Sequence, residues 1–238
     1  MCGFVGFVGG TDNQSEVLTK MMDRIVHRGP DMGGQFIDGR VALGFRRLSI
    51  LDLTEAGAQP MANEDGSVVI VFNGEIYNFQ ELRSELEAKG YKFHCGADTE
   101  SLLHGYEEWG EAVLDRLRGM YAFVIWDKKK NKLFGARDIF GIKPLYYYPM
   151  ADAGDGAPGV LFGSEIKSFL DYPHFHKAVN KKALRPYMTL QYSATEETFF
   201  EGVYKLPPAH YFTVDIPDRQ DERRALLGLR LLRRREAV

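Results

Sequence analysis

The chain has few cysteines, no long apolar run and no strong excess of either charge. Two cysteines in 238 residues, Cys2 and Cys95, are too few for a disulfide scaffold and suit a reducing cytoplasm. No stretch approaches the roughly 18 consecutive apolar residues of a membrane span, and the start, MCGFVGFVGG, lacks the basic and long apolar regions of a signal peptide. A formal net charge of −3 argues against a general nucleic-acid binder. No Cys/His grouping has zinc spacing, so we expect no metal.

The remaining composition, 45% hydrophobic with 13% aromatic residues, supports one sizeable globular core. Apolar periodicity and turn residues predict strands at about 3–8, 34–38, 41–47, 68–73, 119–127, 132–137, 145–149 and 159–163. Helices are expected at about 13–26, 79–89, 99–109, 111–117, 165–170 and 180–188. Because the strands come mostly in adjacent pairs with helices grouped between them, the pattern favours an α+β fold of antiparallel sheets covered by helices.

Cys2 is a candidate nucleophile because of its position. Removal of Met1 gives this residue a free α-amine, whose reference pKa of about 7.7–8.0 leaves much of it able to accept a proton at neutral pH. N-terminal nucleophile enzymes use such an amine in place of a separate histidine base. A lone Cys2 also fits a buried thiol at the start of a strand, and position alone does not separate the two interpretations.

The segment VFNGEIYN (71–78) contains candidate groups for an oxyanion hole. The Asn73 side-chain amide can donate a hydrogen bond, and Gly74 allows its backbone N–H to approach a substrate closely. An ordinary Asn-Gly hairpin turn is the alternative.

Charged residues nearby suit the head group of an amino acid. Arg46 and Arg47 end a predicted strand and offer guanidinium groups for a carboxylate. Glu75 and Asp98 offer negative charge for an ammonium, although Asp98 also suits a helix N-cap. Two further acidic residues, Glu100 and Glu107, are expected to be solvated helix charges.

Several motifs occur in a characteristic order along the chain: MCG at the start, HRGPD (27–31), RLSILD (47–52), NGEIYN (73–78), GADTES (96–101), LRGMYAFVIWD (117–127), GARDIFGIKPLYYY (135–148), FGSEIKSFL (162–170) and KLPPAHYFTV (205–214). In this combination the chain resembles the class II glutamine amidotransferase domain of the asparagine synthetase (glutamine-hydrolysing) family. The resemblance covers residues 2–214. It implies a four-layer α/β/β/α sandwich of two antiparallel sheets, the N-terminal nucleophile hydrolase fold.

The resemblance also implies glutaminase chemistry, in which Cys2 attacks the side-chain amide of glutamine and a thioester forms. Asn73 and Gly74 match the oxyanion hole, and Glu75 and Asp98 match the positions that engage the substrate ammonium. The positions that bind the substrate carboxylate are matched by Arg47 and the segment after it, namely Leu48, Ser49, Ile50 and Leu51. Arg46 matches no functional position, HRGPD is expected to order a turn near the pocket, Cys95 is expected to be a packed thiol, and RDIFGIKPLYY is expected to form a tight turn between strands.

Residues 215–238 differ from the rest of the chain. From position 217 onward there are seven arginines and no lysine. We expect this tail to be disordered or aberrant, with a basic amphipathic helix as the alternative. The phosphate loop of an ATP-dependent synthetase domain is not recognisable after Val214, so we expect no cofactor, neither ATP nor magnesium, to bind this chain.

These observations predict a cytoplasmic, ammonia-supplying glutaminase. Its substrate is glutamine, and its candidate partners are a separate synthetase subunit and a second copy of the chain; neither nucleic acid nor a membrane is expected. Two alternatives remain open: a non-catalytic, glutamine-binding regulatory or scaffold subunit, and a truncated remnant of a synthetase.

Overall fold

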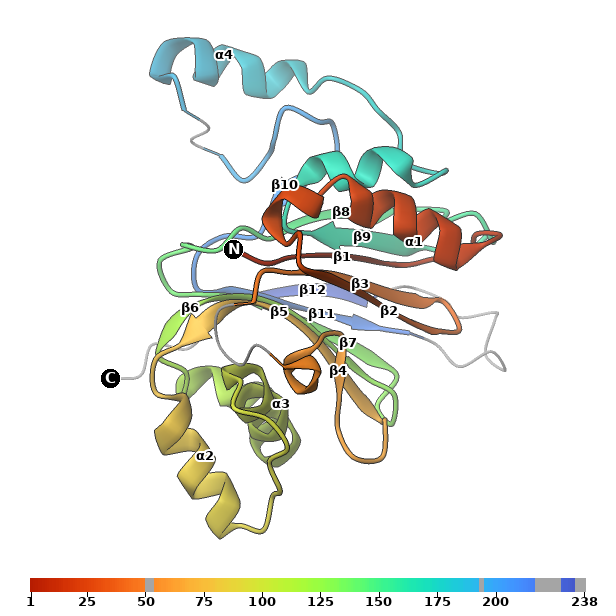
Figure 1. The fold of residues 1–238 in the computed structure, drawn as a ribbon. Coiled ribbons are helices and arrows are strands. Elements are labelled where there is room, and N and C mark those ends of the chain that lie inside the picture. The colour runs from red at the N-terminus through yellow and green to blue at the C-terminus, as the bar shows by residue number, and fades with distance from the viewer. Residues whose placement is uncertain (50–53, 193–194, 217–227, 234–238) are drawn as a thin grey trace.

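The computed structural model describes residues 1–49, 54–192, 195–216 and 228–233 of the 238 residues, with only the backbone described for the last range. Two six-stranded sheets stack face to face (Figure 1). The first has the order β10 (Tyr204–Lys205), β8 (Tyr146–Met150), β9 (Gly159–Gly163), β1 (Gly3–Val8), β3 (Val41–Arg47) and β2 (Met32–Asp38). The second has the order β12 (Gly228–Arg233), β11 (His210–Asp215), β7 (Lys132–Arg137), β6 (Gly119–Asp127), β5 (Val68–Ile76) and β4 (Met61–Ala62).

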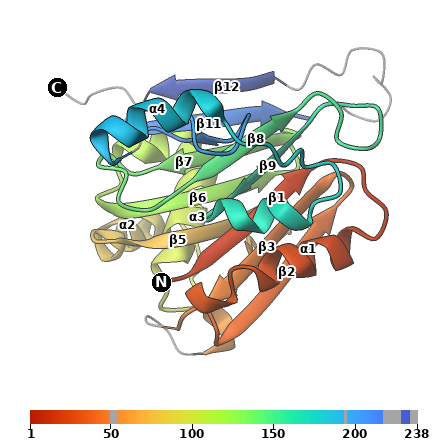
Figure 2. The same cartoon turned by 90° about the horizontal axis from the view of Figure 1, so that it is seen from above.

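All neighbouring strands pair antiparallel. Helix α1 (Gln14–Asp23) and the 3-10 helix η4 (Ile166–Asp171) pack together, and α1 lies over β1, β2 and β3 (Figure 2). Helices α2 (Phe79–Ala88) and α3 (Asp98–Trp109) pack against each other on the opposite side, where α3 contacts β5. The result is the predicted α/β/β/α sandwich, so this prediction is confirmed.

Strand periodicity explains how the two sheets share one core. Successive side chains of a strand point to opposite faces. In β5, Val69 and Val71 pack in the layer between the sheets, whereas Ile70 and Phe72 pack against the helices α2 and α3. Because both faces of these central strands are covered, their sequences are apolar nearly throughout and show little polar alternation.

The remaining elements are short. Helix α4 (Lys181–Leu190) follows η4 on the side of the first sheet, and the 3-10 helices η1 (Val26–Arg28), η2 (Glu55–Gly57) and η3 (Gly110–Asp115) lie in connections. The segments predicted as helices at 111–117 and 165–170 are the 3-10 helices η3 and η4. Among the described residues, no helix has both the length and the apolar character needed to span a membrane.

Among the described residues, four strands were not predicted from the sequence: β4, β10, β11 and β12. The last lies in the tail that is expected to be disordered or aberrant; there, the backbone of residues 228–233 pairs with β11 from His210↔Arg233 to Asp215↔Gly228. This pairing satisfies backbone donors and acceptors that β11 would otherwise present as a free sheet edge. The other positions of the tail beyond 216 lie outside the described residues.

Candidate active site

Cys2 lies at the end of the layer between the two sheets. It directly precedes β1, and the alternation that turns Phe4 into this layer also turns the Cys2 side chain into it. The register of β1 on β3 pairs Gly3 with Arg46, which brings the next residues along, Cys2 and Arg47, to the same strand end. The Leu48 backbone contacts the thiol on two sides: its N–H donates to Sγ at 3.4 Å, and the thiol donates to its carbonyl oxygen at 3.5 Å.

The two neighbouring arginines at the end of β3 point to opposite faces of the sheet. Arg47 follows the parity of Phe45 into the inner layer, where it is 5% exposed and donates from Nη1 to the Thr54 carbonyl at 2.7 Å. Arg46 instead pairs with Asp23 of α1. Strand parity alone therefore brings Arg47 to the site and keeps Arg46 away from it.

Strand β5 does not turn at Asn73, contrary to the predicted end at about residue 73. It continues to Ile76, and Asn73 and Gly74 pair with Ala122 and Tyr121 of β6, so the Asn-Gly turn interpretation is wrong. Parity sends Asn73 into the inner layer with Val71. Among the described residues, Asn73 Nδ2 is one of two buried side-chain nitrogens without a hydrogen-bond partner, the other being Arg28 Nη2. A buried amide donor without a partner is costly, so Asn73 Nδ2 is available to donate to an oxygen atom of a ligand.

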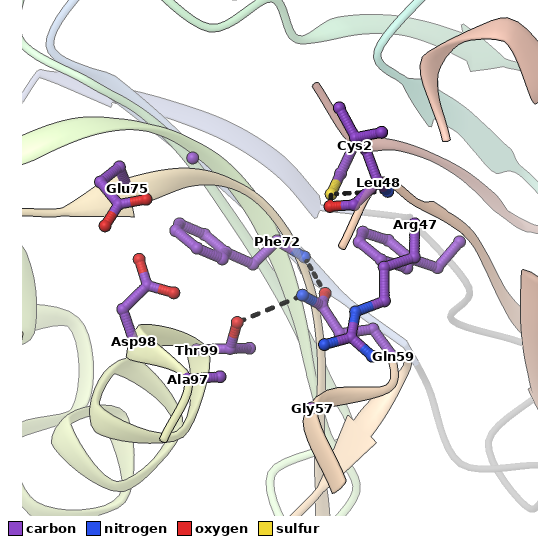
Figure 3. Close-up of a pocket in the computed structure, with 12 residues that line it drawn as sticks. Cys2, Arg47, Leu48, Gly57, Gln59, Phe72, Glu75, Ala97, Asp98 and Thr99 are labelled. Carbon is purple, nitrogen blue, oxygen red and sulfur yellow. Dashed lines mark hydrogen bonds between the residues drawn. The ribbon is translucent and has the colours of Figure 1, made fainter. Parts of the chain in front are cut away.

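Two carboxylates face each other on one side of the pocket, Glu75 from β5 and Asp98 from the first turn of α3 (Figure 3). Asp98 is 5% exposed and accepts a hydrogen bond from the Ile76 N–H at 2.8 Å. Burial raises the pKa of Asp98 to about 6 against the opposing effect of this hydrogen bond, and the charge of Glu75 raises it further. Burial also raises the pKa of Glu75, partly offset by the positive charge of Lys143. Such a pair favours a cation between its members, for example an ammonium group.

An open cavity connects these groups. It is lined by Cys2, Phe45, Arg47, Leu48, Gly57, Gln59, Phe72, Gly74, Glu75, Ala97, Asp98 and Thr99. In Figure 3 the two carboxylates lie on one side, and Cys2, Leu48 and Arg47 lie on the other. The cavity therefore offers a thiol, a guanidinium and two carboxylates in one space.

Of the other predicted site residues, Asn73 lies beside the cavity without lining it, and Ser49 donates its backbone N–H to Asp31 Oδ2 at 2.8 Å. Ile50 and Leu51 lie outside the described residues. The sequence did not single out Gln59, whose side chain links the Phe72 N–H (2.6 Å) to Thr99 Oγ1 (3.2 Å). No local pattern marks this residue, because its partners come from β5 and α3.

Lys143 was also missed as a neighbour of the site. It is 4% exposed, and burial, with the charge of Arg28, lowers its pKa. The only signal in the sequence is a lysine within an otherwise apolar motif. The expected tight turn is present around it: Asp138 accepts hydrogen bonds from the backbone N–H groups of Phe140, Ile142 and Lys143.

The HRGPD motif links Cys2 to β3 through contacts of Arg28 and Gly29. Arg28 Nε donates to the Cys2 carbonyl at 3.0 Å, and its Nη1 donates to Glu165 at 3.0 Å. Gly29 packs so closely that a Cβ there would lie 2.2 Å from the Arg46 carbonyl oxygen. His27 contacts Glu165 at 2.8 Å. These contacts order the turn next to the cavity.

Two expectations about acidic residues of α3 are wrong. Glu100 is 5% exposed and accepts from the backbone N–H groups of His94 and Cys95, so it is a structural carboxylate and not a solvated one. Glu107 contacts His104 and Asn63. The segment before α3 packs against Glu100 and desolvates it, whereas Glu107 is partly buried beside Asn63 of the β4–β5 connection. Cys95 is buried in the core beneath α3, as expected for a packed thiol.

Comparisons with known proteins agree with this geometry. A family model described as "Glutamine amidotransferase domain" matches residues 1–224. Asparagine synthetase [glutamine-hydrolyzing] 1 of Bacillus subtilis is 47% identical over 219 residues, which cover 90% of this chain and 33% of that protein. A putative asparagine synthetase [glutamine-hydrolyzing] of Mycobacterium tuberculosis is 40% identical over 228 residues, which cover 87% of this chain and 34% of that protein. The chain thus spans about a third of the length of these relatives.

Among solved structures, the chain is similar in fold to a glutamine phosphoribosylpyrophosphate amidotransferase from Bacillus subtilis, with a TM-score of 0.66. The two sequences are 20% identical, and the similarity covers 98% of this chain and 49% of that one. At this identity the likeness concerns the fold alone.

Proposed function

Because this chain belongs to the glutamine amidotransferase domain family, we propose that it hydrolyses the side-chain amide of glutamine to glutamate and ammonia, with Cys2 as the nucleophile. The observation that carries the proposal is the single cavity in which the Cys2 thiol, the Arg47 guanidinium and the carboxylates of Glu75 and Asp98 meet. A thiol alone suits many reactions, but a cation and two anions beside it select an α-amino acid with a reactive carbonyl in its side chain.

Binding is proposed to orient the substrate at its head group. Arg47 pairs with the α-carboxylate beside the backbone of Leu48, and the ammonium lies between Glu75 and Asp98. This ammonium adds positive charge between the buried Asp98 and the partly buried Glu75, so it lowers their pKa values on binding. With the head group fixed, the side-chain amide extends toward Cys2.

The chemistry then proceeds through a thioester. Removal of Met1, which is 55% exposed, leaves the Cys2 α-amine as the base that accepts the thiol proton through a water molecule. The sulfur attacks the amide carbon, and the resulting oxyanion accepts hydrogen bonds from Asn73 Nδ2 and the Gly74 N–H. The C–N bond breaks as the nitrogen takes the proton and leaves as ammonia. Water hydrolyses the thioester, and glutamate departs with the thiol restored.

The test is glutamate release from glutamine by the chain with processed Met1, compared with Cys2→Ala and with a variant carrying a non-removable residue before Cys2. Both variants should fall to the uncatalysed rate, whereas Cys95→Ala, which alters a thiol outside the cavity, should retain activity. Hydroxylamine should trap the wild-type intermediate as the γ-glutamyl hydroxamate. Equal glutamate release by all the variants would contradict the proposal, and glutamine binding without hydrolysis by the processed chain would favour the regulatory alternative.

The ammonia is proposed to serve a synthetase domain that activates a carboxylate such as aspartate, whether on the same polypeptide or on a separate subunit. The named relatives are glutamine-hydrolysing asparagine synthetases, and the chain matches about a third of each. Near the cavity, the β7–β8 connection exposes Ile139, Phe140 and Ile142, at 48%, 80% and 54%, which suits an apolar partner surface. Phe140→Ser should leave glutamine hydrolysis unchanged and weaken association with such a domain.

The same proposal covers cofactors and cellular location. The steps above use only side chains, backbone groups and water, so glutamine hydrolysis is proposed to need no cofactor. A thiol nucleophile must stay reduced, and a chain with only two cysteines, Cys2 and Cys95, is too poor in cysteine for a disulfide scaffold, which supports function in the cytoplasm.

A further inference from the structure

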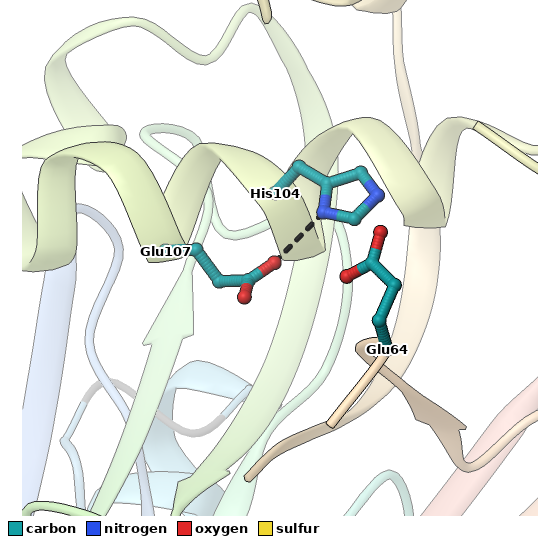
Figure 4. A group of neighbouring side chains, drawn as sticks. All are labelled: Glu64, His104 and Glu107. Carbon is teal, nitrogen blue, oxygen red and sulfur yellow. Dashed lines mark hydrogen bonds and ion pairs between the residues drawn. The ribbon is translucent and has the colours of Figure 1, made fainter. Parts of the chain in front are cut away.

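A second cluster of chemically active side chains lies on α3, nearly two turns beyond Asp98. It contains His104 and Glu107 of the helix and Glu64 of the β4–β5 connection (Figure 4). One potential ligand atom from each residue lies within 4.8 Å of the others. None of the three lines the cavity at Cys2, so the cluster is separate from the glutaminase site.

The His104 ring is held in one orientation. The ring lies 5.2 Å from Tyr91 and 4.9 Å from Phe93, measured between centroids, and the residue is 2% exposed. Its Nε2 is 3.2 Å from the Lys92 carbonyl oxygen, and its Nδ1 is 2.7 Å from Glu107 Oε2. A carbonyl oxygen can only accept, so Nε2 carries a hydrogen. In the neutral ring, Nδ1 then directs its lone pair at the carboxylate.

At 2.7 Å the contact between Nδ1 and Oε2 is a hydrogen bond that needs a proton on Nδ1, and a metal ion bound at Nδ1 replaces this proton while the carboxylate stays beside it as a second ligand. A histidine whose other ring nitrogen donates to a backbone carbonyl is the usual arrangement of a metal-ligating imidazole. Glu107 is arranged in the same way, because Asn63 Nδ2 donates to its Oε1 at 2.6 Å and leaves Oε2 directed at the ring.

The surroundings favour a cation. Glu100 Oε1 lies 3.9 Å from Nε2. Lys129, a neighbouring cation, is paired with Asp65 at 2.6 Å. Glu64 is exposed, so its carboxylate can adjust to complete a coordination sphere.

We propose that Glu64, His104 and Glu107 form a binding site for a divalent transition-metal ion of the zinc class, with His104 Nδ1 and one oxygen of each carboxylate as ligands and water in the remaining position. One nitrogen and two carboxylate oxygens are a donor set that Zn²⁺ accepts. Such an ion fastens the β4–β5 connection to α3, the helix that carries Asp98. Cys/His spacing does not reveal this site, because Glu64 belongs to the β4–β5 connection, far from α3 along the chain.

Calorimetric titration with Zn²⁺ tests the proposal. The full chain carries Cys2→Ser for this experiment, so that the cavity thiol cannot bind the ion. One ion per chain should bind, and Glu64→Gln and Glu107→Gln should each weaken the affinity at least about tenfold. His104→Ala should abolish binding. His27→Ala and Glu108→Gln are matched controls, a histidine and a helix carboxylate outside the cluster, and should leave the affinity unchanged.

Because His104 is buried, its loss also risks misfolding, so the exposed Glu64 gives the safer variant. In addition, ¹⁵N-histidine spectra should show Zn²⁺ shifting the Nδ1 resonance of one ring while the protein stays folded. Absence of saturable binding, equal affinity in Glu64→Gln and the controls, or an Nδ1 resonance that remains protonated at saturating Zn²⁺ would each overturn the proposal. None of these measurements depends on glutamine hydrolysis.

Discussion

The backbone of Leu48 contacts the Cys2 thiol on both sides, donating to Sγ from its N–H and accepting from the thiol at its carbonyl oxygen. The thiol therefore rests against the end of β3, next to the guanidinium of Arg47. In the proposed reaction, a substrate held at Arg47 by its carboxylate reaches the thiol along the same strand end. Under that proposal, one structural element both positions the nucleophile and recognises the head group.

Asn73→Ala should lower kcat for glutamine hydrolysis by about 10²- to 10³-fold with little change in KM, the usual cost of losing one oxyanion donor. Stability should change little, because the Nδ2 group has no hydrogen-bond partner to lose. Steady-state kinetics and urea unfolding check both parts. A large loss of stability with unchanged kcat would contradict the assigned role.

Gln59→Leu should give the opposite pattern. Its Oε1 accepts from the Phe72 N–H, and its Nε2 donates to Thr99, so the substitution leaves a buried backbone donor unpaired. We expect the free energy of unfolding to fall by about 1–3 kcal/mol. Urea denaturation beside Asn73→Ala provides the comparison, and equal stability of the two variants would count against this assignment.

Asp98→Asn should stabilise the substrate-free protein while impairing binding. The folded state keeps the Asp98 proton up to a pKa of about 6, whereas an unfolded Asp loses it near its ordinary value of about 4. Between these values the folded state binds more protons, so stability falls as pH rises from about 4 to 6. Above pH 6 the free energy of unfolding of the wild-type protein is lower by on the order of 3 kcal/mol, and Asp98→Asn should not show this decrease.

Loss of the Asp98 charge should also raise KM for glutamine roughly ten- to hundredfold, the worth of one charge-assisted hydrogen bond. Denaturation curves at pH 4.5 and 7.5, for wild type and variant, test the stability argument. A wild-type protein whose stability rises between these two values, with the variant showing the same rise, would show that other groups dominate.

Gly74→Ala should damage both fold and catalysis. An added Cβ would lie 2.4 Å from the Met120 carbonyl oxygen and 2.8 Å from the Phe72 ring, so β5 must shift away from β6. Overpacking of this kind costs about 1–3 kcal/mol. We expect a lower melting temperature and reduced kcat, and wild-type values of both would show that the strand accommodates the methyl group.

Much of the fold follows from local patterns. Eight strands are identified by short apolar runs between turn residues, since residues such as Val71 and Phe72 are each buried on one face or the other. β11 and β12 were missed because they lie beside a sequence that suggests the end of a domain. The continuation of β5 through Asn73 and Gly74 could not be predicted, because the Asn-Gly pair is a strong turn signal that the pairing with β6 overrides.

The residues of the candidate site also fall into two groups, those that sequence motifs identify and those that they do not. Cys2, Arg47, Asn73, Gly74, Glu75 and Asp98 could be named from motifs, whereas Gln59 and Lys143 could not. Glu100 and Glu107 were expected in solvent because charged helix residues usually lie there. Their burial depends on residues 92–95 and on Asn63, which no helical pattern of α3 reveals.

By itself, the sequence determined which groups are available and which strand face each one occupies, since parity is a property of the local backbone. It therefore settles that Arg47 shares a face with Phe45 and that Asn73 shares one with Val71. Only the tertiary structure decided that these faces meet. Burial of apolar surface stacks the two sheets, pairing of β1 with β3 aligns Cys2 with Leu48, and packing of α3 on β5 brings Asp98 opposite Glu75. These contacts join residues far apart in the chain, so they depend on the free energy of the whole assembled core and not on any local pattern.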